Sequence, residues 1–142
     1  MSPYHKAYPW VDPLTGLDGE ELAANYREAT GQQETIFLGC HGKIGWAIDV
    51  LKRAKDPADR KSIVEAIKGT KTDLTIGHID FTEPVDPNGD GHVHANVYKS
   101  ACCQTQVVKS ADPKYKYDLA LVTAFNAPGA KTVPAIPFVY PS

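Results

Sequence analysis

The sequence predicts an α/β fold whose sheet is incomplete within this chain. Apolar residues recur at helical spacing in the first half, and the second half changes to the two-residue alternation typical of strands. The two clearest helices follow one another closely, as helices that cover a parallel sheet do, yet few segments have the pattern of strands. We therefore expect strands from outside these 142 residues to complete the sheet.

An irregular arm, rich in proline and aromatic residues, opens the chain and runs through Gly16. A helix follows it, because Asp18 can cap the first turn and Glu21, three residues later, completes a capping box. Gly31 is the natural end of this helix, since glycine readily adopts the left-handed conformation of a C-terminal cap.

Residues 34–39, "ETIFLG", form a short apolar run that predicts a buried strand. A second helix is expected from about His41 to Ala54. Its apolar residues fall at i, i+3, i+4 and i+7, so one stripe of this helix must be covered. The stripe consists of Ile44, Ala47, Ile48 and Leu51. If Leu51 is fully buried, its replacement by alanine should cost ~2–5 kcal/mol.

A third helix is predicted from Asp56 to its stop at Gly69. Asp56 is a suitable N-cap, Pro57 is favourable at the first helical position, and Asp59 stands at the third. The residues that this helix should bury are Ile63, Val64 and Ile67.

Beyond the third helix the pattern predicts short strands. Residues 74–81 should hold two extended segments, with a bulge at Gly77. Residues 93–98 alternate between apolar and polar side chains, as a half-buried strand does, and residues 105–109 can pair with them. Residues 117–124, "YDLALVTA", are the strongest remaining strand. The proline-rich tail should run extended over a surface.

Residues 86–94, "DPNGDGHVH", match the start of a calcium-binding loop, in which alternate oxygens surround one cation. Counted from Asp86, the twelfth position should supply a bidentate glutamate, but Val97 stands there. Pro87 and Gly89 also favour a tight turn. A calcium site is therefore the weaker interpretation of this loop.

The same loop carries His92 and His94, which would share one face of a strand and could begin a zinc site. Zinc requires further ligands, and no local spacing joins this pair to the other histidines or to the cysteines. Asparagine, aspartate and glycine readily adopt the backbone angles of a hairpin connection. We therefore interpret the segment as a turn and expect no metal.

Composition excludes several classes of function. The net charge is −2 and no cluster of Lys and Arg could follow a phosphate backbone, so we expect no nucleic-acid partner. No apolar run approaches the ~18 residues of a membrane span, and the first residues do not have the pattern of a signal peptide. No phosphate loop, dinucleotide fingerprint or nucleophile elbow is present, so we expect neither a cofactor nor an enzyme.

The three cysteines, Cys40, Cys102 and Cys103, do not form a disulfide framework, because their number is odd and two are adjacent. They are expected to be small buried hydrophobic residues. Cys40 stands next to His41, but adjacent side chains seldom face one another as a thiol and its catalytic base must.

A series of short matches resembles the C-terminal third of a type I periplasmic solute-binding protein, the kind that serves ABC importers of branched-chain amino acids and related solutes. The matches include "LTGLDGEELAANYREATGQQ", the helical pair "HGKIGWAIDVLKRAKDPADRKSIVEAIKGT" and "KYDLALVT", and they cover most of the chain. Where the family commonly has "KTPLVGGQW", this chain has "KSACCQTQVV" and keeps only Lys99 and Gln106.

The resemblance implies a two-lobed fold with Rossmann-like lobes. Residues 1–142 would be a single segment of this fold and incomplete on their own. Residues up to about 83 would belong to one lobe, and residues 84–142 would form a hinge crossing, a hairpin and the tail of the other. It implies a protein that captures an amino acid or aromatic acid in the cleft between the lobes by hinge closure. Its partners would be a membrane permease and the N-terminal remainder of the protein, or a second copy in its place. Its location would be periplasmic.

The resemblance places the ligand beside Leu38, Gly39, Cys40 and His41, at the start of the second helix, and beside Trp10 in the arm. Cys40, His41 and Trp10 each also have a purely structural interpretation, as a core residue, a helix-start residue and a packed aromatic. The alternative functions are a stand-alone ligand-sensing or interaction domain of the same fold and, less favoured, a small metal-dependent enzyme.

Overall fold

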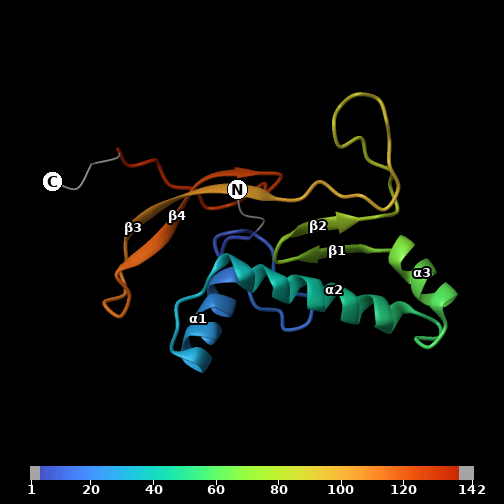
Figure 1. Cartoon of the computed structure of the whole chain (residues 1–142), viewed down its shortest axis with the longest axis horizontal. Helices are drawn as coiled ribbons and strands as arrows, with labels where there is room; N and C mark the ends of the chain where they lie inside the picture. Colours follow the sequence, from blue (N-terminus) through green and yellow to red (C-terminus); the bar gives the residue numbers. More distant parts are fainter. Residues whose placement is uncertain (1–3, 138–142) are drawn as a thin grey trace.

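A computed structural model describes residues 4–137, and over these residues the chain is a small mixed α/β domain with three α helices and two antiparallel sheets of two strands each. Figure 1 shows helices α1 and α2 on one side, the β3–β4 hairpin on the other, and the N-terminal arm between them. The elements are α1 (Gly19–Thr30), the short 3-10 helix η1 (Ile36–Gly39), α2 (Cys40–Arg53), α3 (Arg60–Lys68), β1 (Lys71–Leu74), β2 (Gly77–Asp80), β3 (Cys102–Lys109) and β4 (Tyr117–Phe125).

Helix α1 confirms the predicted signals at both of its ends. Asp18 accepts a hydrogen bond from the backbone N–H of Glu21, and Glu21 accepts one from that of Asp18, each at 2.9 Å. Gly31 closes the helix in the left-handed conformation. The sequence did not reveal the role of Gly19, where any Cβ atom would collide with the backbone carbonyl of Lys6. Glycine at this position lets the arm cross the start of α1.

The strand predicted at residues 34–39 is wrong, because residues 36–39 form η1 and continue directly into α2. Leu38 donates its N–H to the carbonyl of Thr35 at 2.9 Å, so the apolar run satisfies its backbone within a helical turn. Gly39 is the N-cap of α2, and a Cβ atom there would lie 2.6 Å from Cβ of Tyr4. The α2 boundaries agree with the prediction to within one residue.

Helix α3 begins at Arg60, three residues later than predicted. The side chain of Asp59 accepts hydrogen bonds from the N–H groups of Lys61 and Ser62, so Asp59 and not Asp56 is the N-cap. Asp56 instead accepts from the N–H of Ala58 and closes a turn before the helix.

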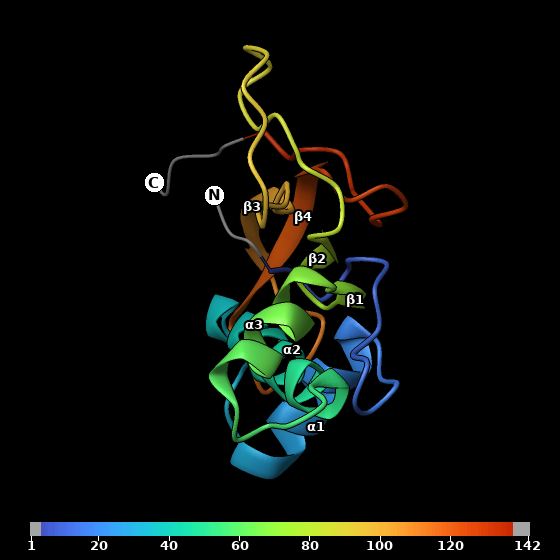
Figure 2. The same cartoon turned by 90° about the vertical axis from the view of Figure 1, so that its right-hand side faces the viewer.

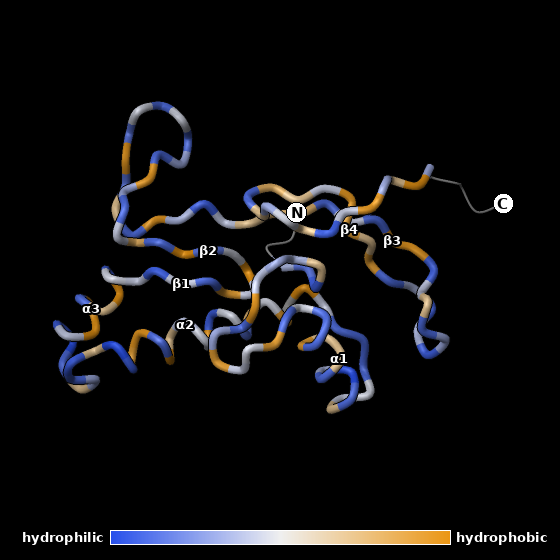
Figure 3. Tube along the Cα trace, turned by 180° about the vertical axis from the view of Figure 1, so that it is seen from behind, coloured by the Kyte–Doolittle hydropathy of each residue, from blue (hydrophilic) through white to orange (hydrophobic). Residues whose placement is uncertain are grey.

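The apolar stripe of α2 is exposed, so its predicted burial is wrong for this chain alone. Ile44 is 61% exposed, Ile48 36% and Leu51 46%. On α3, Val64 is also exposed, Ile63 and Ile67 are half-buried, and Ala66 is the buried residue. Figure 3 shows apolar positions recurring along α2.

Helix α2 instead packs two of its glycines and Val50 against the rest of the chain. Gly42, Gly45 and Val50 are buried. A Cβ atom on Gly42 would lie 3.0 Å from Oγ1 of Thr75, and one on Gly45 would lie 3.4 Å from Oδ1 of Asp12. The glycine face therefore allows α2 to approach the rest of the chain closely, and this close approach points the larger apolar stripe outward.

Two separate cores lie on the two sides of the arm. Strands β1 and β2 pair antiparallel, with Gly77 at φ +139° where β2 begins. Beside α2 lies a helix-side core of Tyr4, Leu74, Ile76 and Ile79. Against the hairpin lies a hairpin core of Tyr8, Ala101, Cys103, Leu121 and Ala127. The arm contributes one tyrosine to each core and so joins them.

The strand predicted at residues 93–98 is also wrong, and with it the pairing expected for residues 105–109. The segment between β2 and β3 projects from the molecule (Figure 2), and Val93 is 64% exposed. Within this segment, Val85 and His94 form one isolated bridge. β3 pairs with β4 instead, and the ladder has a register shift between Gln104 and Thr105. Beyond this one bridge, residues 93–98 have no paired strand beside them in the part of the chain that the structure describes, which explains why they do not form a strand.

The tail runs over the hairpin as expected, through Pro137; Pro141 lies outside the described residues. The side-chain amide of Gln106 holds it by donating to the carbonyl of Ile136 at 2.6 Å and accepting from its N–H at 2.7 Å. Val133 also donates its N–H to the carbonyl of Leu121. No helix in the described part of the chain has the length and apolarity that a membrane crossing requires.

Candidate binding pocket

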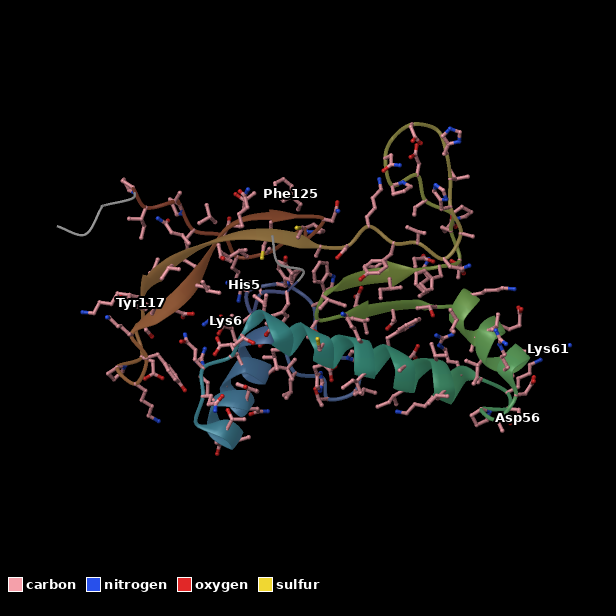
Figure 4. The ribbon with its side chains drawn as sticks, viewed as in Figure 1. His5, Lys6, Asp56, Lys61, Tyr117 and Phe125 are labelled. Carbon is pink, nitrogen blue, oxygen red and sulfur yellow. The ribbon has the colours of Figure 1, made fainter. Side chains whose placement is uncertain are left out.

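A pocket of about 400 Å³ lies where the arm, the α1–α2 connection and the β3–β4 hairpin meet. We call it the arm pocket. The arm contributes Tyr4, His5 and Lys6, the connection contributes residues 33–36, and the hairpin contributes Val107 and residues 117–119. Figure 4 shows His5 and Lys6 between the helices and β4, with Tyr117 at the outer end of the hairpin. Residues more than 100 positions apart in sequence thus form one site.

Four charged side chains form a network at the pocket wall. The ammonium of Lys6 lies 3.1 Å from Glu34 Oε1 and 2.9 Å from Asp118 Oδ2. Arg27 also binds Glu34. Its Nη2 donates to Oε1 at 2.6 Å and its Nε donates to Oε2. Two cations therefore face two anions, and the network as a whole is neutral.

The network favours the charged forms of Glu34, Lys6 and Arg27. Burial by itself would raise the pKa of Glu34, but hydrogen bonds from Arg27 and Lys6 outweigh it and lower the pKa to about 2. Burial likewise opposes the charge of Lys6, yet its bonds to Asp118 and Glu34 raise the pKa of the ammonium. The side chain of Glu34 is only 8% exposed, so this carboxylate depends on its two partners.

The hairpin meets the helical side of the pocket mainly through polar contacts. Gln33 donates its side-chain N–H to the carbonyl of Tyr117 at 2.7 Å. The guanidinium of Arg27 lies 5.9 Å from the ring centre of Tyr115, which is within cation–π range. The apolar lining comes from Ile36, Val107 and Leu119. A ligand here would meet apolar walls and a charged edge.

Two of the five predicted ligand residues, Leu38 and His41, lie together in a neighbouring hollow of about 250 Å³. This hollow shares Thr35 with the arm pocket. Gly39 is buried and Cys40 is exposed. Trp10 lies apart from them, packed against the hairpin core with its ring edge-on to Tyr8 at 5.4 Å.

His41 faces a fully buried carboxylate. Its Nδ1 atom lies 3.3 Å from Oδ1 of Asp12, but the two atoms do not have hydrogen-bond geometry. The other oxygen of Asp12 accepts from the N–H and the hydroxyl of Thr15, at 2.8 and 2.7 Å. Asp12 therefore closes its own turn and lies beside the first turn of α2.

The loop that resembles a calcium site is closed by its own first residue. Asp86 accepts backbone hydrogen bonds from Gly89 at 2.7 Å and from Gly91 at 2.8 Å, with longer ones from Asn88 and Asp90. These bonds lower the pKa of Asp86. The carboxylate oxygens of Asp86 thus stabilise a turn, which agrees with the interpretation of this segment as a turn. Within residues 4–137, no three His, Cys, Asp or Glu side chains gather as a metal site would need.

The three cysteines differ in exposure, although all were expected to be buried. All three are free thiols: Cys103 is buried in the hairpin core, Cys102 is half-buried and Cys40 is exposed. The prediction of burial is therefore correct for Cys103 and wrong for Cys40. Cys40 occupies the first residue of α2 and is exposed there.

Comparison of the chain with protein-family models, with curated proteins and with solved structures gave no match.

Sequence reasoning missed the arm pocket because no local pattern marks it. Lys6 is separated from Glu34 by 28 positions and from Asp118 by 112. Each of these residues alone has the pattern of a solvated surface charge. The only local signal was Gly19, an unexplained glycine at the first position of a helix, which reveals that another segment crosses there.

Proposed function

We propose that this chain is the solute-capturing part of a binding protein for an ABC importer and that it holds a small organic solute in the arm pocket. The main support is the volume of the arm pocket together with the residues that line it. The volume of about 400 Å³ falls within the range of small-molecule sites. Apolar walls with a few charged groups at one edge suit binding and orientation rather than catalysis, so the proposed protein is not an enzyme.

The charges of the pocket favour a zwitterion such as an amino acid. Lys6 can share its ammonium with a ligand carboxylate, and Asp118, whose side chain is 30% exposed, can accept from a ligand ammonium. The apolar side chain of the ligand would then lie against Ile36, Val107 and Leu119. A ligand with a single charge would disturb the balance of the network. The hollow beside Leu38 and His41 offers room for a longer ligand.

The exposed α2 stripe supports a further part of the proposal, that additional chain covers this face in the functional protein. Leaving a large aliphatic side chain in water forfeits ~1.5–3 kcal/mol of burial free energy. We propose the N-terminal remainder of a two-lobed protein as the covering partner, with a second copy of this chain as its substitute. A membrane permease would then receive the solute, and the protein would work in the periplasm.

Thermal unfolding in the presence of candidate solutes tests the binding site. L-leucine, L-phenylalanine and benzoate, each at millimolar concentration, form a suitable panel, and a ligand present at 100 times its Kd should stabilise the fold by about 2.7 kcal/mol. We expect an amino acid to raise the melting temperature and benzoate to do so less. Lys6→Met should abolish the shift, and Lys61→Met, on the exposed side of α3, should preserve it.

Two results would refute this proposal. One is the absence of a shift with every amino acid, and the other is a shift that Lys6→Met leaves unchanged. If no solute binds but the chain pairs with another protein through α2, the alternative of an interaction domain gains support, because the exposed stripe of Ile44, Ile48 and Leu51 is the observation that favours it.

A further inference from the structure

His5 is held by hydrogen bonds at both nitrogens of its ring. Nε2 lies 3.0 Å from the backbone carbonyl oxygen of Leu119 on β4, and the N–H of Ala7 donates to Nδ1 at 3.1 Å. A carbonyl only accepts and a backbone N–H only donates, so these two partners require a neutral ring with its proton on Nε2. His5 is only 6% exposed, so water cannot easily replace either partner.

These bonds fix the arm against the hairpin at the wall of the arm pocket. His5 and Leu119 both line the pocket, and the carbonyl of Ala7 accepts from the N–H of Lys131 in the tail at 3.1 Å. His5 thus joins the arm to β4, and Ala7 joins it to the tail. Adding a proton to Nδ1 would set two N–H groups against each other and place a charge in a buried site.

We propose that His5 is a pH-sensitive latch: its neutral ring holds the arm against β4 and keeps the arm pocket formed, and its protonation releases the arm and opens the pocket. The latch is independent of which solute the pocket binds and of whether the chain belongs to an importer.

The charged groups around His5 come from three elements. Lys6 on the arm repels a positive ring, whereas Asp118 on β4 and Glu20 on α1 attract it. Burial is the largest influence and lowers the pKa of His5, while the Leu119 carbonyl opposes it. A lowered pKa in the folded state means that the neutral ring stabilises the docked arm above about pH 6.5 and that this stabilisation is lost as the pH falls through the folded-state pKa.

Fluorescence of Trp10 can follow the arm. The chain has two tryptophans, so a Trp46→Phe background leaves Trp10 as the only tryptophan signal. Acrylamide quenching measured from pH 8 to pH 4.5 should rise about twofold, with a midpoint below pH 6.5. In His5→Gln the amide can still donate to Leu119 but does not titrate, so quenching should not change over this range. His92→Gln, in the exposed loop, is the matched control and should keep the transition.

Three results would overturn the latch. The first is a flat quenching profile in the protein with histidine at position 5, and the second is a transition that persists in His5→Gln. The third is a loss of far-UV circular dichroism with the same midpoint, because the event would then be unfolding of the helices. If His5→Gln fails to fold, 15N NMR of the ring decides: we expect the proton on Nε2 at pH 8, and a proton on Nδ1 would refute the latch.

Discussion

The helical region, residues 17–81, and the hairpin region, residues 99–137, are stabilised in different ways. The helical region rests on capped helices and on the helix-side core, and it leaves the large apolar stripe of α2 in water. The hairpin region rests on one long ladder and on the hairpin core. Apolar burial stabilises each region internally. The arm connects the two through one tyrosine in each core and through Lys6, which pairs with Glu34 of the helical region and Asp118 of the hairpin region; Gln33 also donates directly to Tyr117.

This difference explains the position of the arm pocket. The two regions have separate cores, and polar side chains rather than apolar packing fill much of the boundary between them. The arm crosses this boundary and places one tyrosine in each core. His5 and Lys6, between the two tyrosines, are left to line the space. The pocket is thus a consequence of having two small cores rather than one.

The largest expected effect is in the helix-side core. Leu74 is 1% exposed, so Leu74→Ala should lower the free energy of unfolding by ~2–5 kcal/mol through lost burial and a cavity. Urea denaturation followed by circular dichroism measures it. Leu121→Ala, at 2% exposure in the hairpin core, is the matched change in the other region. If Leu74→Ala costs less than about 1 kcal/mol, this core does not hold the helical region.

A smaller effect is expected where the two regions meet. Lys6→Met removes the cation that pairs with Glu34 and Asp118, leaving both short of a partner, and should cost about 1–3 kcal/mol. Lys61→Met should stay within about 0.5 kcal/mol, because it changes an exposed lysine. Equal effects from the two substitutions would contradict the description of the connection as electrostatic.

Acid should weaken the same connection. The pKa of Glu34 is lowered to about 2 in the folded chain, so its pairing stabilises the fold above its usual pKa of 4.5 and is lost as the pH falls toward 2. Glu34→Gln should therefore reduce the loss of stability between these pH values. Glu28→Gln, exposed on α1, should leave the pH profile unchanged. Denaturant midpoints at a series of pH values provide the measurement, and identical profiles for the two variants would be inconsistent with a paired Glu34.

Loss of a helix cap should cost about 1 kcal/mol in the helical region alone. Asp18→Ala removes one half of the capping box of α1 and leaves the backbone N–H of Glu21 without the side-chain partner it now has. Asp59→Ala tests the cap of α3 in the same way, whereas Asp56→Ala should have a smaller effect because Asp56 does not cap the helix. Thermal unfolding curves distinguish these variants. If Asp56→Ala destabilised the chain more than Asp59→Ala, Asp59 would not be the N-cap of α3.

The smallest effect is expected on the exposed stripe. Leu51 is 46% exposed, so Leu51→Ala should change the stability of this chain by less than about 1 kcal/mol. The same substitution should weaken pairing with a chain that covers α2. A cost of 2 kcal/mol or more in the isolated chain would show that the stripe is buried after all.

Local signals predicted the parts of the fold that depend on near neighbours. The cap of α1, its stop at Gly31 and the bounds of α2 depend on residues within one or two turns, and the sequence alone was sufficient for them. The strand errors at 34–39 and 93–98 have a different origin. An apolar or alternating run becomes a strand only if a partner strand lies beside it, and no local pattern reports whether one does.

The candidate site was harder to predict than the fold. Leu38 and His41 were expected to lie together and do, because they are close in sequence. The arm pocket depends on Lys6 meeting Glu34 and Asp118, which follows only from the way the arm crosses Gly19. Whether the predicted residues or the arm pocket contact a ligand is decided by the binding experiments above.

The crossing of the arm also determines when the domain can be completed during synthesis. The bond from His5 to Leu119 spans 114 positions, and that from Lys6 to Asp118 spans 112. These two contacts can therefore form only after β4 has been synthesised, whereas α1, α2 and the β1–β2 pair are built from residues that are close in sequence. Because contacts between distant residues form slowly, the bonds of His5 and Lys6 to β4 should be among the last to form during folding.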